Sequence, residues 1–443
     1  MSRVIQSQRV VIGDEVRPAV IRIEDGKITA IEAYLRDAGS GVEDFGTHVI
    51  MPGCIDIHVH VNEPGRADWE GFETATRAAA YGGITSLMEM PLNSDPSTVT
   101  LDALNQKIAS TEGKLSMNVG LYAGVVPGQV DELDAMLRKG AIAGKAFMIY
   151  SGMDDFQWSD PQTLREGMQV LVKHNKPLLA HAEVMLDSAV ISPEAVWTSY
   201  QHYLNARPPE FELEAIKILV DLCRETGCAV HVVHLSAIEG LELINAAKAE
   251  GLPITVETCP HYLYFAAEDI PDGQTQFKCA PPIRAGENRT ALRAALAGGQ
   301  LDLVATDHAP CLPALKKMDI GDFKTAWGGI FCLQLFLPST WTAMKESGVS
   351  LPQLAQLVAT RPAEVVGLSD RGKVEPGYVA DLVVWDPDSA FEVTADRLQH
   401  RHKISPYLGE RLYGETIETI LGGETVFAKG SMRAEGQGSL LTQ

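Results

Sequence analysis

Apolar runs of strand length alternate with amphipathic stretches of helix length through the middle of the chain, and this alternation restricts the fold more than any other feature. Eight β/α alternations over roughly 300 residues favour a (β/α)8 barrel, the TIM barrel of the α/β class, over an open sheet. The expected strands are 54–60, 84–90, 116–125, 142–149, 177–182, 228–235, 253–258 and 301–306, and the expected helices include 69–81, 129–139, 161–174, 209–226 and 237–250.

Both ends of the chain have a different pattern. The first 50 residues contain the short alternating runs RVVIGDEV and AVIRIEDGKITAIEA, in which the pairs GD and DG mark hairpin turns. The C-terminal stretches GKVEPGYVADLVVWDPDS and ETIETILGGETVFAKG repeat this style. We therefore expect a small β-sandwich built from residues 1–50 and 366–443, which encloses a barrel of residues 51–365.

Composition excludes several classes of partner. Lys and Arg number 37 against 58 for Asp and Glu, so the formal charge is -21. Such an acidic surface repels phosphate backbones and anionic lipids, and we expect neither nucleic acid nor membrane as a partner. The seven Cys have no CxxC spacing and the N-terminus has no apolar signal segment. This combination is typical of reduced thiols in a cytoplasmic protein.

Polar side chains that can bind metals stand on five of the apolar runs, mostly at their C-terminal ends. In a barrel the active site is built at that face. His58 and His60 are two residues apart, so the period of a strand points both to one side. The full candidate set is His58, His60, Lys145, His181, His234 and Asp307.

Each of these residues also has an ordinary structural interpretation. A single His at a strand end is more often a hydrogen-bonded core or surface residue, and an Asp after a strand is often a helix cap or turn residue. His231 lies three residues before His234, and we choose His234 because it is nearer the end of the strand. Lys145 in the apolar stretch AIAGKAFMIY is harder to explain structurally, because an unpaired buried ammonium is costly.

The chemistry of the set explains its members together. Imidazoles and a carboxylate suit Zn, Co, Ni or Mn. A desolvated Lys145 amine can add CO2, and the two oxygens of the resulting carbamate can bridge two metal ions. Because hydroxide between two such ions is a strong nucleophile at neutral pH, the predicted reaction is hydrolysis of an amide-like bond. Asp307 would take up a proton and deliver it to the leaving nitrogen.

The motifs PGCIDIHVH, GKAFM, LLAHAE, HVVHLS and ATDHAP resemble the amidohydrolase superfamily, in its cyclic-amidase branch of dihydroorotases, hydantoinases and allantoinases. Within that branch NEPGRADWEGFETATRAAAYGGITSLMEMPLN, ETCPHYL, KCAPPIR, AWGGIFCLQ and HKISPYLG are similar to allantoinases. The resemblance covers nearly the whole chain. It implies hydrolytic opening of the hydantoin ring of allantoin to allantoate, a step of purine and ureide degradation, by a hydroxide that bridges two metals.

The resemblance also implies a specific role for each site residue. His58 and His60 would bind one metal ion with Asp307, and His181 and His234 would bind the other. Lys145, carboxylated to N6-carboxylysine, would bridge them, and Asp307 would also be the catalytic proton carrier. The expected ions are two divalent metals, Zn before Co, Mn or Ni. A homotetramer is expected from the resemblance alone.

Substrate selection separates the alternatives. Dihydroorotases usually carry Arg two residues after the second metal His, for the substrate carboxylate, whereas this chain has Asn62. The alternative enzymes are a hydantoinase or dihydropyrimidinase and, as a more distant possibility, a dihydroorotase. A metal-free scaffold protein ranks below them, because all six candidate metal ligands are present. The expected ligand is a small cyclic ureide, and its candidate binding residues are Asn93, Cys279, Ala280 and Pro281.

Overall fold

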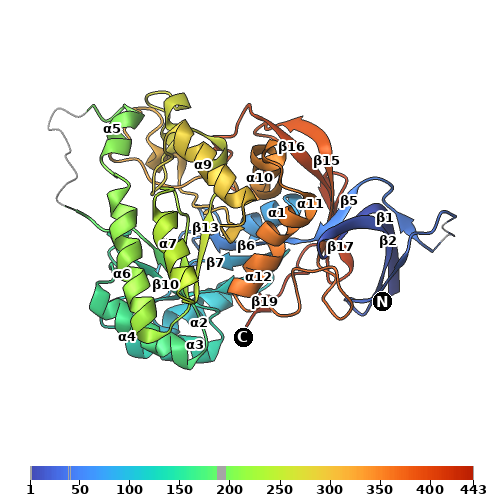
Figure 1. Ribbon diagram of the computed structural model, residues 1–443, viewed down its shortest axis with the longest axis horizontal. Helices are drawn as coiled ribbons and strands as arrows, with labels where there is room; N and C mark the ends of the chain where they lie inside the picture. The colour runs from blue at the N-terminus through green and yellow to red at the C-terminus, as the bar shows by residue number, and fades with distance from the viewer. Residues whose placement is uncertain (1, 38, 40, 187–195, 443) are drawn as a thin grey trace.

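Parallel strands separated by helices form the middle of the molecule in the computed structural model, which describes residues 2–37, 39, 41–186 and 196–442 (Figure 1). Strands β6 to β8 pair in parallel, and so do β9 to β14. The strands are β6 (Cys54–Val59), β7 (Ile84–Glu89), β8 (Asn118–Leu121), β9 (Ala123–Gly124), β10 (Gly144–Phe147), β11 (Leu178–His181), β12 (Val230–Val232), β13 (Ile254–Thr258) and β14 (Leu303–Val304).

These two groups of strands close into a ring. β8 and β9 follow each other at one strand position, where Tyr122 N donates to the carbonyl of Glu89 and Ala123 N to that of Ala143. On the other side, a parallel bridge joins Val59 to His308, and His60 N donates to the His308 carbonyl over 2.8 Å. The described residues thus form the eight-stranded barrel that the sequence predicts, with each expected strand in place.

The helices that connect the strands cover the outside of the barrel, and the five expected helices are confirmed. Local signals explain their ends: Asp160 caps one helix by accepting from Thr163 N, and Gly140 ends another in the left-handed conformation. The helices are α1 (Phe72–Tyr81), α2 (Leu101–Ser110), α3 (Val130–Lys139), α4 (Pro161–Lys173), α5 (Tyr200–Asn205), α6 (Glu210–Thr226), α7 (Gly240–Ala249), α8 (Pro260–Tyr264), α9 (Gly286–Ala297), α10 (Phe336–Met344), α11 (Leu351–Ala355) and α12 (Arg361–Val365).

Strands from both ends of the chain lie in one further sheet, beside the barrel (Figure 1). Its order is β18-β17-β16-β15-β5-β1-β2-β3, with β4 paired to β1, so β5 and β15 join the two ends of the chain. The two predicted hairpin turns lie between β1, β2 and β3. The strands are β1 (Ser2–Ile12), β2 (Glu15–Glu24), β3 (Lys27–Ala33), β4 (Glu43–Asp44), β5 (Val49–Pro52), β15 (Leu382–Glu392), β16 (Arg411–Leu421), β17 (Glu424–Ala428) and β18 (Ser431–Met432).

The last strand of the chain, β19 (Leu440–Leu441), does not join this sheet. It pairs in parallel with barrel strand β8, opposite Val119 and Gly120. The boundaries of the predicted domains, at residues 50 and 366, stay a prediction. The pairing of β19 with β8 places the C-terminal end of the chain against the barrel, whereas the prediction assigns that end to the sandwich.

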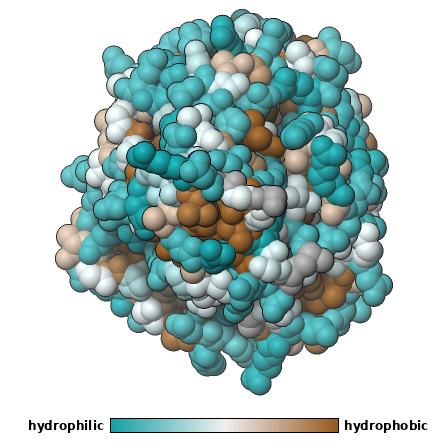
Figure 2. All heavy atoms as spheres, turned by 90° about the vertical axis from the view of Figure 1, so that its right-hand side faces the viewer, coloured by the Kyte–Doolittle hydropathy of each residue, from teal (hydrophilic) through white to brown (hydrophobic). Residues whose placement is uncertain are grey.

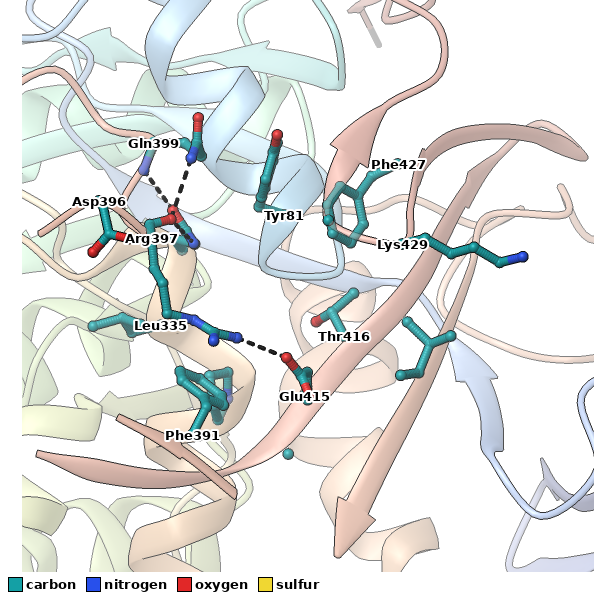
Figure 3. Close-up of a pocket in the computed structure, with 15 residues that line it drawn as sticks. Tyr81, Leu335, Phe391, Asp396, Arg397, Gln399, Glu415, Thr416, Phe427 and Lys429 are labelled. Atoms are coloured by element: carbon teal, nitrogen blue, oxygen red, sulfur yellow. Dashed lines mark hydrogen bonds and ion pairs between the residues drawn. The ribbon is translucent and has the colours of Figure 1, made fainter. Parts of the chain in front are cut away.

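The terminal sheet meets the barrel at a hollow of about 550 Å³ between α1, α10 and the strands β15 to β17 (Figure 3). The Tyr81 and Phe427 rings lie 4.4 Å apart between centroids there, and Arg397 pairs with Glu415 over 2.6 Å. None of the predicted site residues lines this hollow. The end of the molecule that carries the terminal sheet is largely hydrophilic, with an apolar area near the centre of the view (Figure 2). Among the residues that the structure describes, no helix combines the length and apolar character needed to cross a bilayer.

Candidate active site

A cavity of about 520 Å³ opens at the C-terminal ends of the barrel strands. Five of the six predicted metal ligands line it: His58, His60, His181, His234 and Asp307. The sixth, Lys145 in β10, is fully buried, and its Nζ lies 5.2 Å from the ring centroid of Phe147, which does line the cavity. The structure therefore brings together residues that are spread over 250 positions of the sequence.

Asp307 lies between the two histidines of the first motif. Its Oδ1 is 3.2 Å from Nε2 of His58 and 3.5 Å from Nε2 of His60. His58, His234 and Asp307 each offer a ligand atom, and these three atoms lie within 4.8 Å of one another. Two imidazole nitrogens and a carboxylate oxygen at this spacing match the donor set of a divalent transition-metal ion.

His181 and His234 form a second pair of facing nitrogens. Nδ1 of His181 lies 2.9 Å from Nε2 of His234, and the two rings meet edge to face with centroids 4.5 Å apart. The other nitrogen of His234, Nδ1, is buried without a hydrogen-bond partner in the described part of the chain. A metal ion can take the place of the proton between two nitrogens that face each other in this way.

Lys145 has an ammonium group with no partner among the described residues, although its side chain is fully buried. Burial lowers the pKa of Lys145 to about 8, because an apolar environment disfavours the charged form. About a tenth of the amine is therefore neutral at pH 7, and the neutral form is the one that can react with CO2.

Burial also keeps the imidazoles in their neutral form. It lowers the pKa of His58, His181 and His234 below the ordinary value for histidine, and neighbouring positive groups lower those of His58 and His234 further. Neutral imidazole is the form that binds metals. The environment of the site thus keeps these three side chains in the neutral form that can bind a metal ion.

Glu257 on β13 holds several of these groups, and the sequence analysis did not single it out. Its Oε1 lies 2.5 Å from Nδ1 of His58 and accepts from His234 N over 3.1 Å, while its Oε2 lies 3.0 Å from Nε2 of His231. His231 is thus bound to Glu257, and His234 is the one of the two that lines the cavity. A charged residue inside the buried run ITVET is the signal that could have identified Glu257, because the same reasoning selected Lys145.

Glu183 contacts His181 in a similar way. Its Oε2 lies 2.7 Å from Nε2 of His181, and Arg207 pairs with the same carboxylate. Burial would raise the pKa of Glu183, but the charge of Arg207 and the contact with His181 outweigh it and lower the pKa to about 2. A carboxylate on the outer nitrogen of a ligand histidine fixes its tautomer and its orientation.

Three site residues hold a strained backbone conformation. The φ angles of His234, Asp307 and Asn93 are 40°, 48° and 71°, in the left-handed region that non-glycine residues seldom adopt. Such strain costs free energy, on the order of 1 kcal/mol each, and it concentrates at functional sites. In each case the left-handed residue lies two to four residues after the end of a barrel strand and lines the cavity.

The predicted substrate residues divide into two groups. Asn93 and Ala280 line the cavity. Asn93 also donates from Nδ2 to Nδ1 of His60 over 3.1 Å, which leaves its Oδ1 without a partner among the described residues. Cys279 and Pro281 do not line the cavity, and their carbonyl oxygens accept from the hydroxyls of Tyr203 and Tyr262 over 2.6 and 2.7 Å.

Comparison with known proteins agrees with this arrangement. The model of the family described as "Amidohydrolase family" matches residues 49–426. The chain is 45% identical to a probable allantoinase of Oryza sativa subsp. japonica, over 96% of this chain and 88% of the relative, and 42% identical to an allantoinase of Streptomyces avermitilis, over 99% and 98%. Among solved structures, an L-hydantoinase (dihydropyrimidinase) from Arthrobacter aurescens matches with a TM-score of 0.94 at 30% identity, over 100% of both chains.

Proposed function

This chain belongs to the amidohydrolase family, and we propose that it opens the hydantoin ring of allantoin by hydrolysis of an amide bond, giving allantoate. The observation that carries the proposal is the cavity at the barrel mouth, where four histidines and Asp307 converge beside a buried lysine that has no partner among the described residues. A cyclic ureide is small enough for a cavity of about 520 Å³.

We propose that the site holds two divalent metal ions. His58, His60 and Asp307 would hold one ion, and His181 and His234 the other, with Lys145 as a carbamate between them. The contact between His181 and His234, the neutral state of the buried imidazoles and a Lys145 Nζ with no partner among the described residues support this assignment. When bound, such ions supply a nucleophile from water at neutral pH and polarise the scissile carbonyl. Zn fits the donor set first, with Co, Mn or Ni as alternatives.

The protein groups then have separate tasks. Glu257 accepts from Nδ1 of His58, so the lone pair on Nε2 faces Asp307. Glu183 does the same for His181 at Nε2, so the lone pair on Nδ1 faces His234. Asp307 is 7% exposed at the cavity wall, so its carboxylate can hold a proton and deliver it to the departing ring nitrogen. Asn93 and Ala280 line the space for the ring.

Turnover of allantoin, hydantoin and dihydroorotate by the purified protein tests this function. Each substrate is offered before chelation, after chelation and after metal is added back. Allantoate formation that depends on metal, with slow turnover of the other two, is the expected result. Faster turnover of hydantoin would instead indicate a hydantoinase, and faster turnover of dihydroorotate would indicate a dihydroorotase. Inactivity of metal-replete protein would favour a scaffold role.

We further propose that the enzyme is a cytoplasmic homotetramer. All seven cysteines are free and buried, which suits a reducing compartment. Light scattering coupled to size-exclusion chromatography measures the assembly, and a monomer at micromolar concentration would contradict it.

A further inference from the structure

Two irregular segments form the wall of the active-site cavity away from the metal ligands. Lys278 and Ala280 line the cavity from one segment, and Trp327, Gly328 and Gly329 line it from the other. None of these five residues belongs to a helix or strand, so no ladder of regular hydrogen bonds fixes their peptide groups. Their position must therefore come from other contacts.

Lys316 supplies these contacts from behind the wall. It ends the short 3-10 helix η3 (Pro313–Lys316), and its side chain is fully buried. Its Nζ donates to the carbonyl oxygen of Gly329 over 2.6 Å, to that of Trp327 over 3.0 Å and to that of Lys278 over 3.2 Å. One ammonium thus binds both segments. The segments also bind each other, because Gly329 N donates to the carbonyl of Lys278 over 2.8 Å.

The placement of this ammonium is unusual in energetic terms. In the described part of the chain no carboxylate pairs with it, and its hydrogen-bond partners are backbone carbonyls. Burial lowers the pKa of Lys316 to about 8, because an apolar environment disfavours the charged form. An apolar residue would avoid that cost but would leave several buried carbonyls without a donor.

Ala280 and Gly328, which adjoin the peptide groups that Lys316 holds, both line the cavity. The two residues lie at ordinary van der Waals distance, since a Cβ on Gly328 would be 3.9 Å from Ala280 N. Within the described residues, neither Ala280 N nor Gly328 N donates a hydrogen bond. A cyclic ureide carries carbonyl acceptors and amide donors around its ring, so it can pair with peptide groups of this kind.

We propose that Lys316 is a positioning residue for substrate binding, which holds the Lys278–Ala280 and Trp327–Gly329 peptides at the spacing that a five-membered ureide ring requires. The inference rests on the proposed function, since it concerns the same cavity. Lys316 touches neither the predicted metal ligands nor the reacting bond. Its loss should therefore weaken ring binding while the metal centre stays intact.

The experiment compares unaltered protein with Lys316→Met, which is unbranched and one heavy atom shorter and which removes the charge and the donors. Lys317→Met is the matched control, because Lys317 is the next residue and lines no part of the cavity. KM and kcat for allantoin, bound metal and circular dichroism are measured for each. We expect Lys316→Met to raise KM about tenfold, with kcat lowered less than threefold and metal content unchanged, because binding of the ring is lost in ground and transition state alike.

A second variant covers the case in which Lys316→Met does not fold. Lys316→Arg keeps the charge and donors in a planar group, so the protein should remain folded with KM raised about threefold. Unchanged KM in folded Lys316→Met, or in Lys316→Arg if only that variant folds, would overturn the inference, as would an equal rise in KM for Lys317→Met. Failure of the unaltered, metal-replete protein to hydrolyse allantoin would instead overturn the proposed function.

Discussion

Oε1 of Glu257 lies 2.5 Å from Nδ1 of His58, although 199 residues separate the two in sequence. The contact fixes which nitrogen of His58 carries the proton, and it leaves Nε2 facing Asp307 at 3.2 Å. The same carboxylate accepts from the backbone N–H of His234. One buried side chain thus orients predicted ligands of both proposed metal ions.

The first prediction concerns this carboxylate. Glu257→Gln should keep the fold, because the amide is nearly the same size, but should weaken metal affinity about 10- to 100-fold. The amide oxygen can still accept hydrogen bonds from one side of the group. The NH2 group, on the other side, is a donor and cannot accept from the donors that now bind the second carboxylate oxygen. Competition with a chromophoric chelator measures the affinity. Glu242→Gln on the exposed face of α7 is the control. Equal affinity in the two variants would show that Glu257 has no part in metal binding.

The sequence predicts the barrel and the metal ligands because both depend on local pattern. Each strand is an apolar run that a helix separates from the next, and parallel strands in a barrel bring their C-terminal ends together. His58 at the first strand and Asp307 after the last could therefore be assigned to one site without coordinates. Their contact in the structure follows from closure of the ring between β6 and β14.

The residues behind the ligands could not be predicted in the same way. Glu183 and Arg207 act on His181 through contacts that only the folded chain defines. Lys316 has no periodic signal, since it lies in an irregular connection after β14 and its partners are backbone carbonyls. Asn93 was predicted to face the substrate, but its bond to His60 depends on a left-handed turn that a single Asn does not reveal.

The second prediction tests the bridging role of Lys145. Lys145→Ala should remove most of the metal and reduce turnover below about a thousandth, since no other side chain replaces the carbamate oxygens. Short carboxylic acids should restore part of the activity, because the space left by the side chain can admit a carboxylate. Metal analysis and allantoate formation with and without acetate measure both effects. Lys173→Ala, on the exposed last turn of α4, is the control. Retention of two metal ions with normal turnover would contradict the carbamate.

The third prediction concerns proton transfer by Asp307. Asp307→Asn should lower kcat by about three orders of magnitude or more, because the amide cannot take up and return a proton. The fold should remain, since the change is nearly isosteric, and thermal unfolding checks this. Asp319→Asn at an exposed position gives the reference value. A kcat within about tenfold of the unaltered protein would assign the proton to another group.

The last prediction follows from the environment of Lys145. Only the neutral amine adds CO2, and burial lowers the pKa of Lys145 to about 8. The neutral fraction therefore rises with pH, from about a tenth at pH 7 to about nine tenths at pH 9. At a fixed concentration of dissolved CO2, chelated protein should form the carbamate about tenfold faster at pH 9 than at pH 7. The ¹³C NMR signal of labelled CO2 follows the carbamate directly, and return of activity on addition of metal follows it independently. Lys145→Ala should show no such signal at either pH. Equal rates at the two pH values would mean that an amine other than Lys145, or another step, limits reconstitution.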